Sequence, residues 1–406
     1  MPAQLRRIFA DLHLHIGSTS SGDSVKISAS RNLTFRNIAH EAAHRKGISL
    51  LGVIDCHSPG VQRDIAELLD CGEMEETQGG GIRYRETTIL LGAEIEVKDA
   101  GFGLAHHLVY LPTFAAICDF TKWISRYMRN VQLSSQRIYV PARELQQEVC
   151  GRGGLFIPAH IFTPHKSLFG SCSDRLADTL DPERVHAVEL GLSADTAMAC
   201  RLGDLARYPY LSNSDAHSLS KIGREYNEFA MKEPSFAELE LVLRSSGGRG
   251  IVANYGLNPL LGKYHRTRCL ACDALAEEGP EVAVCRKCGS SKLVRGVMDR
   301  IEQLAGSYSV ADKRRDEQRQ AARPPYHYQV PLEFLPGVGR KTLEKLLQRF
   351  GTEMAILHDA GFAAIADTAG VAVAEAIMAV RAGTIELQAG GGGRYGHVRR
   401  AAAARG

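Results

Sequence analysis

The chain has 406 residues, with 49 Lys and Arg against 46 Asp and Glu, which gives a formal net charge of +3. Hydrophobic residues at 44% and charged residues at 23% are typical of a soluble globular protein of two or three domains, and they exclude a chain dominated by a polybasic or polyacidic tail. The charge is uneven: residues 261–406 carry 22 Lys and Arg against 16 Asp and Glu, whereas acidic residues exceed basic ones in 1–260. This asymmetry favours chemistry in the first part and a polyanionic partner for the second.

The start of the chain has no apolar run before Asp11, and no run of about 18 apolar residues follows, so we expect neither a secretory signal nor a membrane partner. Six of the ten cysteines are scattered, as is typical of reduced thiols. We therefore expect a cytoplasmic protein, associated with the nucleoid if the source is bacterial. The sequence leaves protein partners and oligomeric state open.

Residues 1–260 alternate short β-branched runs with helical patterns, such as 34–46 and 235–244. The expected strands lie at 8–10, 50–54, 88–91, 107–111, 154–158, 185–189 and 210–213. This pattern predicts an α/β fold, and about 250 residues in one unit suits a barrel. Such barrels carry their active sites at the carboxyl ends of the strands.

Histidines and carboxylates gather at these predicted strand ends. His13 and His15 are two residues apart in extended backbone, so both imidazoles point to one face. The other candidates at strand ends are Glu94, His106 or His107, His160, Asp215 and His217. Each histidine alone would suit a structural role, but their convergence predicts a nest of N and O ligands for two or three divalent ions (Zn²⁺, Mn²⁺ or Mg²⁺) with a bridging carboxylate.

Four cysteines form a second predicted metal site within 261–306. Cys269-x-x-Cys272 and Cys285-x-x-Cys288 are two thiolate knuckles with the spacing of a tetrahedral structural zinc site. Gly289 suits the left-handed turn after the second knuckle. This zinc module would present its basic residues to phosphates.

The remaining chain is predicted as a basic linker or exposed helix (307–330), a helical domain (331–388) and a low-complexity, disordered tail (389–406). In the helical domain, Leu-Pro-Gly-Val-Gly-Arg-Lys precedes an amphipathic helix. Two glycines at a helix N-terminus expose N–H groups to a phosphate, and adjacent basic side chains add charge. The predicted DNA-binding residues are Gly337, Gly339, Arg340, Lys341 and Lys345. The motif resembles a helix-hairpin-helix, which grips a DNA backbone without reading its sequence.

The order Asp-x-His-x-His, Gly-Ala-Glu, His-x-Leu, Ala-His and Asn-Ser-Asp-Ala-His resembles the PHP (polymerase and histidinol phosphatase) superfamily of distorted (β/α)7 barrels. Its members hydrolyse phosphoesters with up to three metal ions. The resemblance implies one ion held by His13, His15, Glu94 and Asp215, a second held by Glu94, His106 and His160, and a third served by His217. His106 is preferred over His107 because the family has a histidine two residues before a leucine, here Leu108.

The third ion site departs from the family pattern. Asp55 matches the carboxylate of the family's Thr-Asp-His motif, but Cys56 stands in the histidine's place and His57 follows one residue late. The usual polar residue after the His-x-His motif corresponds to Ser20 or Ser21. The choice between Asp55 and His57 as a ligand stays open, and two ions are better supported than three.

Barrel, zinc module and hairpin together resemble the endonuclease Q family over nearly the whole chain, to about residue 385. Segments that carry the likeness include Phe156–Pro164, Asn213–Leu219 and Ala253–Pro259. The resemblance implies a metal-dependent DNA repair endonuclease that cuts double-stranded DNA 5′ of uracil, hypoxanthine, xanthine or abasic sites, with Glu94, Asp215 and His217 as catalytic residues. The alternatives are a small-molecule phosphoesterase like histidinol phosphatase, and a DNA-binding PHP protein without catalysis.

Overall fold

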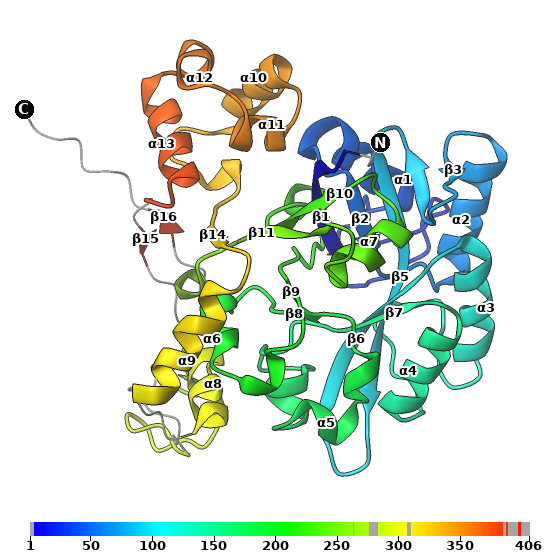
Figure 1. Cartoon of the computed structure of the whole chain (residues 1–406), viewed down its shortest axis with the longest axis vertical. Coiled ribbons are helices and arrows are strands. Elements are labelled where there is room, and N and C mark those ends of the chain that lie inside the picture. Colours follow the sequence, from blue (N-terminus) through cyan, green and yellow to red (C-terminus); the bar gives the residue numbers. More distant parts are fainter. Residues whose placement is uncertain are drawn as a thin grey trace, which may run out of the picture.

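The computed structural model describes residues 4–262, 264–275, 283–306, 310–384, 387–388 and 397–398. A mixed ten-stranded sheet with surrounding helices forms the main body, and two smaller helical lobes lie beside it (Figure 1). One lobe contains α10–α13, and the other contains α8 and α9 next to the cysteine module.

The sheet is parallel at its centre and mainly antiparallel toward both sides, with one edge pair that is again parallel. β1 (Arg6–Leu14), β2 (Leu50–Val53) and β5 (Thr87–Lys98) run parallel to one another. The other strands are β3 (Glu75–Glu76), β4 (Ile82–Tyr84), β6 (Leu104–Leu111), β7 (Leu155–Pro158), β10 (Tyr226–Met231), β11 (Gly250–Gly256) and β14 (Tyr326–Tyr328). The order is β14-β11-β10-β1-β2-β5-β4-β3, and β6 joins β5 to β7.

All seven predicted strands are present, which confirms the α/β layout, but the expected closed barrel is not seen. β8 (Val188–Glu189) and β9 (Tyr210–Leu211) are two residues long and pair only with each other. Single backbone hydrogen bonds, such as the one from His186 N to Phe156 O at 3.1 Å, connect this pair to β7. Among the described residues no strand ladder completes the ring, because the antiparallel strand β10 occupies the free side of β1.

Helices cover the sheet and connect its strands. In the main body they are α1 (Phe35–Glu41), α2 (Pro59–Asp70), α3 (Phe114–Ile124), α4 (Ala142–Gly151), α5 (Leu176–Thr179), α6 (Thr196–Cys200) and α7 (Phe236–Leu243). The side chains of Thr34, Thr113 and Ser235 each accept a hydrogen bond from a backbone N–H in the first turn of α1, α3 and α7. These N-caps explain why the predicted helices at 34–46 and 235–244 begin where they do.

Two apolar cores hold the main body together. One is a cluster to which β1, β2, β5, β6, β7, β9, β10 and α7 all contribute, including Leu12, Leu90, Ile157 and Leu211. Strands that share one cluster must curve around it, so the open sheet still bends toward a barrel shape. The second, larger core lies between the sheet and its helices and continues into the α10–α13 lobe.

The predicted linker (307–330) is partly structured. α8 (Val297–Ala305) precedes it, and within it lie α9 (Val310–Ala321) and β14, which pairs with β11 and so extends the main sheet. Most of the predicted disordered tail lies outside the described residues. Within it, β16 (His397–Val398) pairs with β15 (Leu387–Gln388).

The α10–α13 lobe docks on the main body through polar and aromatic contacts. Its helices are α10 (Arg340–Phe350), α11 (Glu353–His358), α12 (Phe362–Ala369) and α13 (Val371–Arg381). Lys46 Nζ lies 2.8 Å from Glu353 Oε1, and both residues are buried. The His358 ring stacks on Phe9 with centroids 4.4 Å apart. These contacts fix the lobe against β1 and against the helical segment Ala42–Lys46, which follows α1.

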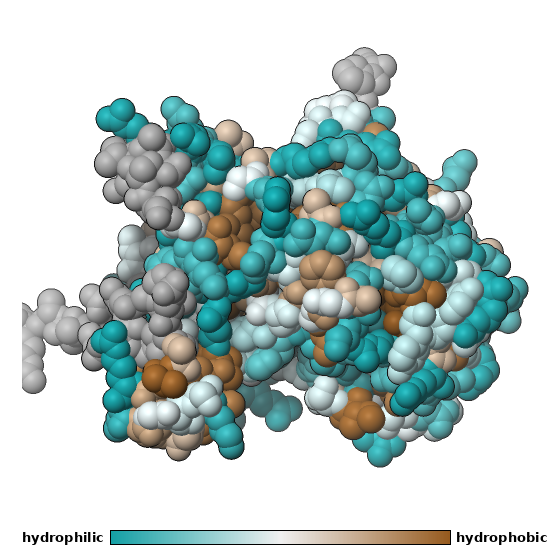
Figure 2. Space-filling model, turned by 90° about the horizontal axis from the view of Figure 1, so that it is seen from below, coloured by the Kyte–Doolittle hydropathy of each residue, from teal (hydrophilic) through white to brown (hydrophobic). Residues whose placement is uncertain are grey.

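The face of the molecule that is seen from below is mainly hydrophilic (Figure 2). Figure 2, which views the molecule from below, shows apolar surface in separate patches between polar regions. The exposed large apolar side chains come from distant segments, for example Ile27, Leu260 and Phe362. No helix in the described part of the chain is long and apolar enough to cross a membrane.

Candidate active site

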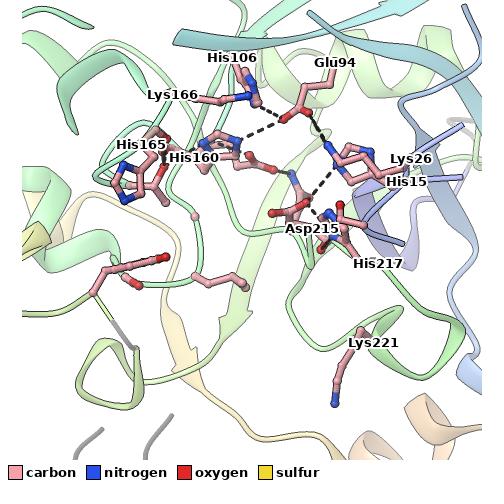
Figure 3. A pocket seen from close by; sticks show the side chains of 18 of the residues that line it. His15, Lys26, Glu94, His106, His160, His165, Lys166, Asp215, His217 and Lys221 are labelled. Carbon is pink, nitrogen blue, oxygen red and sulfur yellow. Dashed lines mark hydrogen bonds and ion pairs between the residues drawn. The ribbon is translucent and has the colours of Figure 1, made fainter. Parts of the chain in front are cut away.

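A pocket of about 520 Å³ opens at the ends of the central strands (Figure 3). Six of the predicted ligands line it: His15, Glu94, His106, His160, Asp215 and His217. They come from β1, β5, β6 and the loops after β7 and β9, so the fold brings together residues that are 200 positions apart in the chain. The structure thereby gathers in one place the side chains expected to converge.

The first group consists of His13, His15, Glu94 and Asp215. Asp215 Oδ1 lies 3.5 Å from His13 Nε2 and 3.3 Å from His15 Nε2. Glu94 Oε1 is 3.6 Å from His13 Nε2, and Glu94 Oε2 is 3.7 Å from His15 Nε2. Donor atoms at such separations suit one shared ion with bonds of about 2.0–2.2 Å. His13 Nε2 is buried without a hydrogen-bond partner, as expected of a nitrogen that coordinates a metal ion.

The second group shares Glu94 with the first. Glu94 Oε1 lies 2.8 Å from His106 Nδ1 and 3.2 Å from His160 Nε2. Glu94 thus faces both groups, Oε1 toward His13, His106 and His160 and Oε2 toward His15, so its carboxylate is placed to be shared between two ions. His107 points to the other face of β6 and packs against Phe156 with ring centroids 4.9 Å apart. Strand alternation therefore places His106, and not His107, at the pocket.

His217 joins a third, weaker group with His15 and Asp215. Its Nδ1 lies 3.0 Å from the Asp215 backbone oxygen and 3.5 Å from Asp215 Oδ1. The other predicted contributors near this position face elsewhere. Asp55 Oδ2 lies 3.1 Å from His15 Nδ1, behind the ring, and His57 Nε2 faces the Leu133 carbonyl at 3.3 Å.

A layer of carboxylates behind the histidines orients them. Glu189 Oε1 is 3.0 Å from His13 Nδ1, and Asp55 Oδ2 holds His15 Nδ1 in the same way. Glu189 Oε2 also accepts a hydrogen bond from His160 N at 2.7 Å. Carboxylates that hold the far nitrogen of a histidine fix its tautomer and turn the other nitrogen toward the ion. The sequence reasoning missed Glu189, although a lone carboxylate inside the apolar run 185–190 is a usable signal.

The backbone is strained where it delivers these side chains. Seven non-glycine residues of the described chain have a positive φ, and four of them lie at or beside the pocket: Ser135, His160, Lys166 and Asp215, with φ between 30° and 54°. Left-handed conformations of such residues cluster at functional sites. Gly191 leaves room for His160, because a Cβ at this glycine would lie 2.8 Å from the His160 Cβ.

The carboxylates of the pocket are held in their charged form. Burial favours neutral Glu94, but His106 and Lys26 outweigh it and hold the pKa of Glu94 well below its ordinary value. Burial likewise opposes ionisation of Asp215, yet His13 and His15 keep its pKa well below the ordinary value. In turn Glu189 and Asp215 overcome burial and raise the pKa of His13 to about 10. Ionised carboxylates in a buried cluster favour bound cations.

The four cysteines of the second predicted site also meet. The Sγ atoms of Cys269 and Cys288 are 3.6 Å apart, as are those of Cys272 and Cys285. This is far longer than a disulfide bond of about 2.05 Å and suits thiolates that share a zinc ion with bonds of about 2.3 Å. Gly289 has the expected left-handed φ of 71°. The four cysteines thus form a cluster able to hold a metal ion.

The predicted DNA-binding residues lie on the exposed end of the α10–α13 lobe. Gly337 turns the chain with a φ of 88°, and α10 begins at Arg340 directly after Gly339. Arg340, Lys341 and Lys345 are exposed, whereas Leu346 and Leu347 pack into the core. The geometry suits a backbone contact, and the assignment as a helix-hairpin-helix stays a prediction.

Known proteins share this fold. A family model described as "PHP-associated" matches residues 196–245. The structure of a lesion-specific endonuclease from Pyrococcus furiosus, PfuEndoQ, is similar with a TM-score of 0.81 and 31% identity, over 97% of this chain and 95% of that one. The structure of endonuclease Q in complex with a 27-mer duplex containing an abasic lesion matches with a TM-score of 0.79 and 31% identity, over 98% and 97% of the two chains.

Among curated sequences, the uncharacterized protein YqxK of Bacillus subtilis is 48% identical over 397 residues, which is 97% of this chain and all of that protein. These matches define the class as an α/β protein of the PHP type that carries a cysteine cluster, as the sequence predicted. Within that class, the chain belongs to the endonuclease Q family.

Proposed function

We propose that this chain is a metal-dependent endonuclease that nicks double-stranded DNA 5′ of deaminated bases (uracil, hypoxanthine, xanthine) or abasic sites. The observation that carries the proposal is the pocket itself, in which Glu94 is shared by two histidine groups, on a chain that is similar along its whole length to a lesion-specific endonuclease. The choice of lesions rests on the family alone.

In the proposed enzyme His13, His15, Glu94 and Asp215 hold one ion, and Glu94, His106 and His160 hold a second. Divalent ions in such a pair lower the pKa of water toward neutrality and balance charge on phosphoryl oxygens. Glu189 and Asp55 keep the two β1 histidines oriented for this task. These roles fit the donor set, because imidazole and carboxylate ligands suit Zn²⁺ and Mn²⁺.

His217 is the proposed proton donor to the departing 3′ oxygen. Its Nδ1 faces Asp215, so Nε2 is left for a substrate group, and about a third of its side chain is exposed at the pocket. The lesion nucleotide reaches the pocket by leaving the base stack, which costs less at a mispaired or missing base.

The remaining modules hold the duplex in this proposal. The exposed N-terminus of α10 and its basic side chains contact phosphates, and the cysteine cluster with a bound zinc gives the adjacent basic segment a fixed shape. Such contacts position DNA without reading its sequence.

The test uses labelled duplexes that each contain one uracil, hypoxanthine, xanthine or abasic site, with an undamaged duplex as control. The purified full-length protein is incubated with Mg²⁺, Mn²⁺ or Zn²⁺, and the cut is mapped at nucleotide resolution. A metal-dependent nick 5′ of the lesion is the expected result. Hydrolysis of histidinol phosphate without any DNA cut would favour the small-molecule phosphoesterase, and DNA binding without hydrolysis would favour the inactive alternative.

A further inference from the structure

Lys26 reaches into the pocket from the loop between β1 and α1. Its Nζ donates a hydrogen bond to Ser135 Oγ at 2.6 Å and lies 3.5 Å from Glu94 Oε2, and only 17% of its side chain is exposed. Ser135 in turn donates to the same Glu94 oxygen. Figure 3 shows Lys26 beside His15 on one side of Glu94, while His106 and His160 lie on the other. A lysine with so little of its side chain exposed is uncommon unless it is paired, and Lys26 is paired with Glu94.

The backbone around Lys26 is fixed on three sides. Lys26 N donates to Ile16 O at 2.9 Å, and Val25 bonds through its N–H to Gly17 and through its carbonyl to Ser134. Val25, which precedes Lys26, is buried, whereas Ile27, which follows Lys26, is 80% exposed. The loop thus directs Lys26 into the pocket, although Ile27 directly after it faces solvent. The ammonium group is therefore in place before any substrate binds.

Apart from His217, the residues that correspond to donors of a third ion in the family pattern face away from this part of the pocket. Cys56 is a buried thiol whose Sγ–H points to Val53 O at 3.2 Å, and burial raises the pKa of this thiol far above its ordinary value. Ser20 Oγ bonds to Asp64, and His57 faces Leu133 O. Of this set only His217 lines the pocket, and the charge of Lys26 acts on both His217 and His15.

We propose that Lys26 contacts the scissile phosphate and supplies the positive charge that a third cation would give, so that the pocket holds two ions. An ammonium has three N–H donors. Ser135 takes one, and the long contact to Glu94 leaves a donor free for a phosphoryl oxygen. The ammonium also repels a further cation at His217. The proposal rests on the phosphodiesterase function proposed above.

The first test compares Lys26→Met, Lys26→Arg and a remote control, Lys122→Met, whose lysine is exposed on α3. Single-turnover cleavage is measured with enzyme in excess, together with the dissociation constant for the DNA. Lys26→Met should lower the cleavage rate constant by about 10²-fold, the cost of losing one donor to developing charge. Lys26→Arg should recover most of that loss, and Lys122→Met should cleave as the original protein does. Cleavage by Lys26→Met at the original rate would overturn the phosphate contact.

The second test counts metal and does not depend on cleavage. Zinc-loaded protein, desalted and analysed by mass spectrometry of its metal content, should hold two ions in the pocket and one at the cysteines, and Lys26→Met and His217→Ala should hold the same number. A fourth ion in the original chain would mean a third ion in the pocket. That result, or the loss of one ion in His217→Ala, would overturn the proposal that Lys26 takes the place of a third cation. Loss of an ion in Lys26→Met would show that Lys26 supports the metal site and would overturn the substrate contact. If the original chain cuts no DNA, the proposed function fails, while the metal count still tests Lys26.

Discussion

Glu189 Oε1 lies 3.0 Å from His13 Nδ1, so a buried carboxylate from β8 sets the direction of an imidazole from β1. The opposite nitrogen of the ring then faces Glu94 and Asp215. A two-residue strand that the main sheet does not include thus sets the geometry of this part of the pocket.

Glu189→Gln should weaken metal binding at the pocket by about 10–100-fold, because an amide cannot hold the ring nitrogen with the same charge and tautomer. The measurement is a competitive titration with a fluorescent chelator. Glu183→Gln is the matched control, since Glu183 is an exposed carboxylate that pairs with Arg207. Equal metal affinity of the Glu189→Gln and Glu183→Gln proteins would contradict the orienting role.

Asp215→Ala should reduce nicking of a uracil-containing duplex by more than about 10³-fold, as loss of an essential group in a cooperating set does. Asp215 lies 3.3–3.5 Å from both β1 histidines, so its removal opens the first metal group. DNA binding, measured by fluorescence anisotropy, should stay nearly unchanged because the phosphate contacts proposed at the start of α10 do not involve Asp215. Asp204→Ala, at an exposed carboxylate, serves as the control. Retained nicking with bound metal would remove Asp215 from the site.

The sequence indicated which side chains meet in the pocket better than it indicated what surrounds them. His13, His15, Glu94 and Asp215 were recognisable because each stands in a short motif of fixed spacing in or after a predicted strand. Lys26 lies in a loop without a pattern, and it reaches Glu94 only because the chain folds back on Gly17. Such contacts depend on tertiary packing, which local spacing does not encode.

The strands show the same division. Short apolar, β-branched runs located β1, β2, β5, β6 and β7, but the described residues do not show the barrel expected from them. β14, at 326–328, pairs in parallel with β11 after an excursion through the cysteine module. Neither segment carries a sequence signal for a pairing over that separation. The sequence therefore predicted a linker at residues that include a strand of the main sheet.

His358→Phe should reduce the loss of stability that the docked α10–α13 lobe undergoes at acidic pH. Burial, with the nearby charge of Arg7, lowers the pKa of His358 to about 4. The folded state therefore prefers the neutral ring. The stability that this ring contributes is complete above pH 6.5 and is lost as the pH falls from 6.5 to about 4, by at most about 3 kcal/mol.

Hydrogen exchange of the α11 amides, corrected for intrinsic rates, measures this opening. In the original chain, protection should fall between pH 6.5 and 4, and in His358→Phe the fall should be smaller. The phenyl ring keeps the stacking on Phe9 but loses the contact between His358 Nε2 and Tyr226 Oη at 2.7 Å, so the variant should be less protected at pH 7.5. An identical pH dependence in both proteins would exclude His358 as the titrating group.

Replacement of Arg340 and Lys341 by Ala should weaken DNA binding for damaged and undamaged duplexes alike, because phosphate contacts carry no sequence information. Both side chains are exposed at the start of α10, beside the turn at Gly337. If each contacts one phosphate, the slope of log K against log salt concentration should become less steep by about 0.9 per contact. The same titration on Lys122→Ala controls for a general loss of positive charge. A salt slope equal to that of the original chain would show that this turn does not touch the DNA backbone.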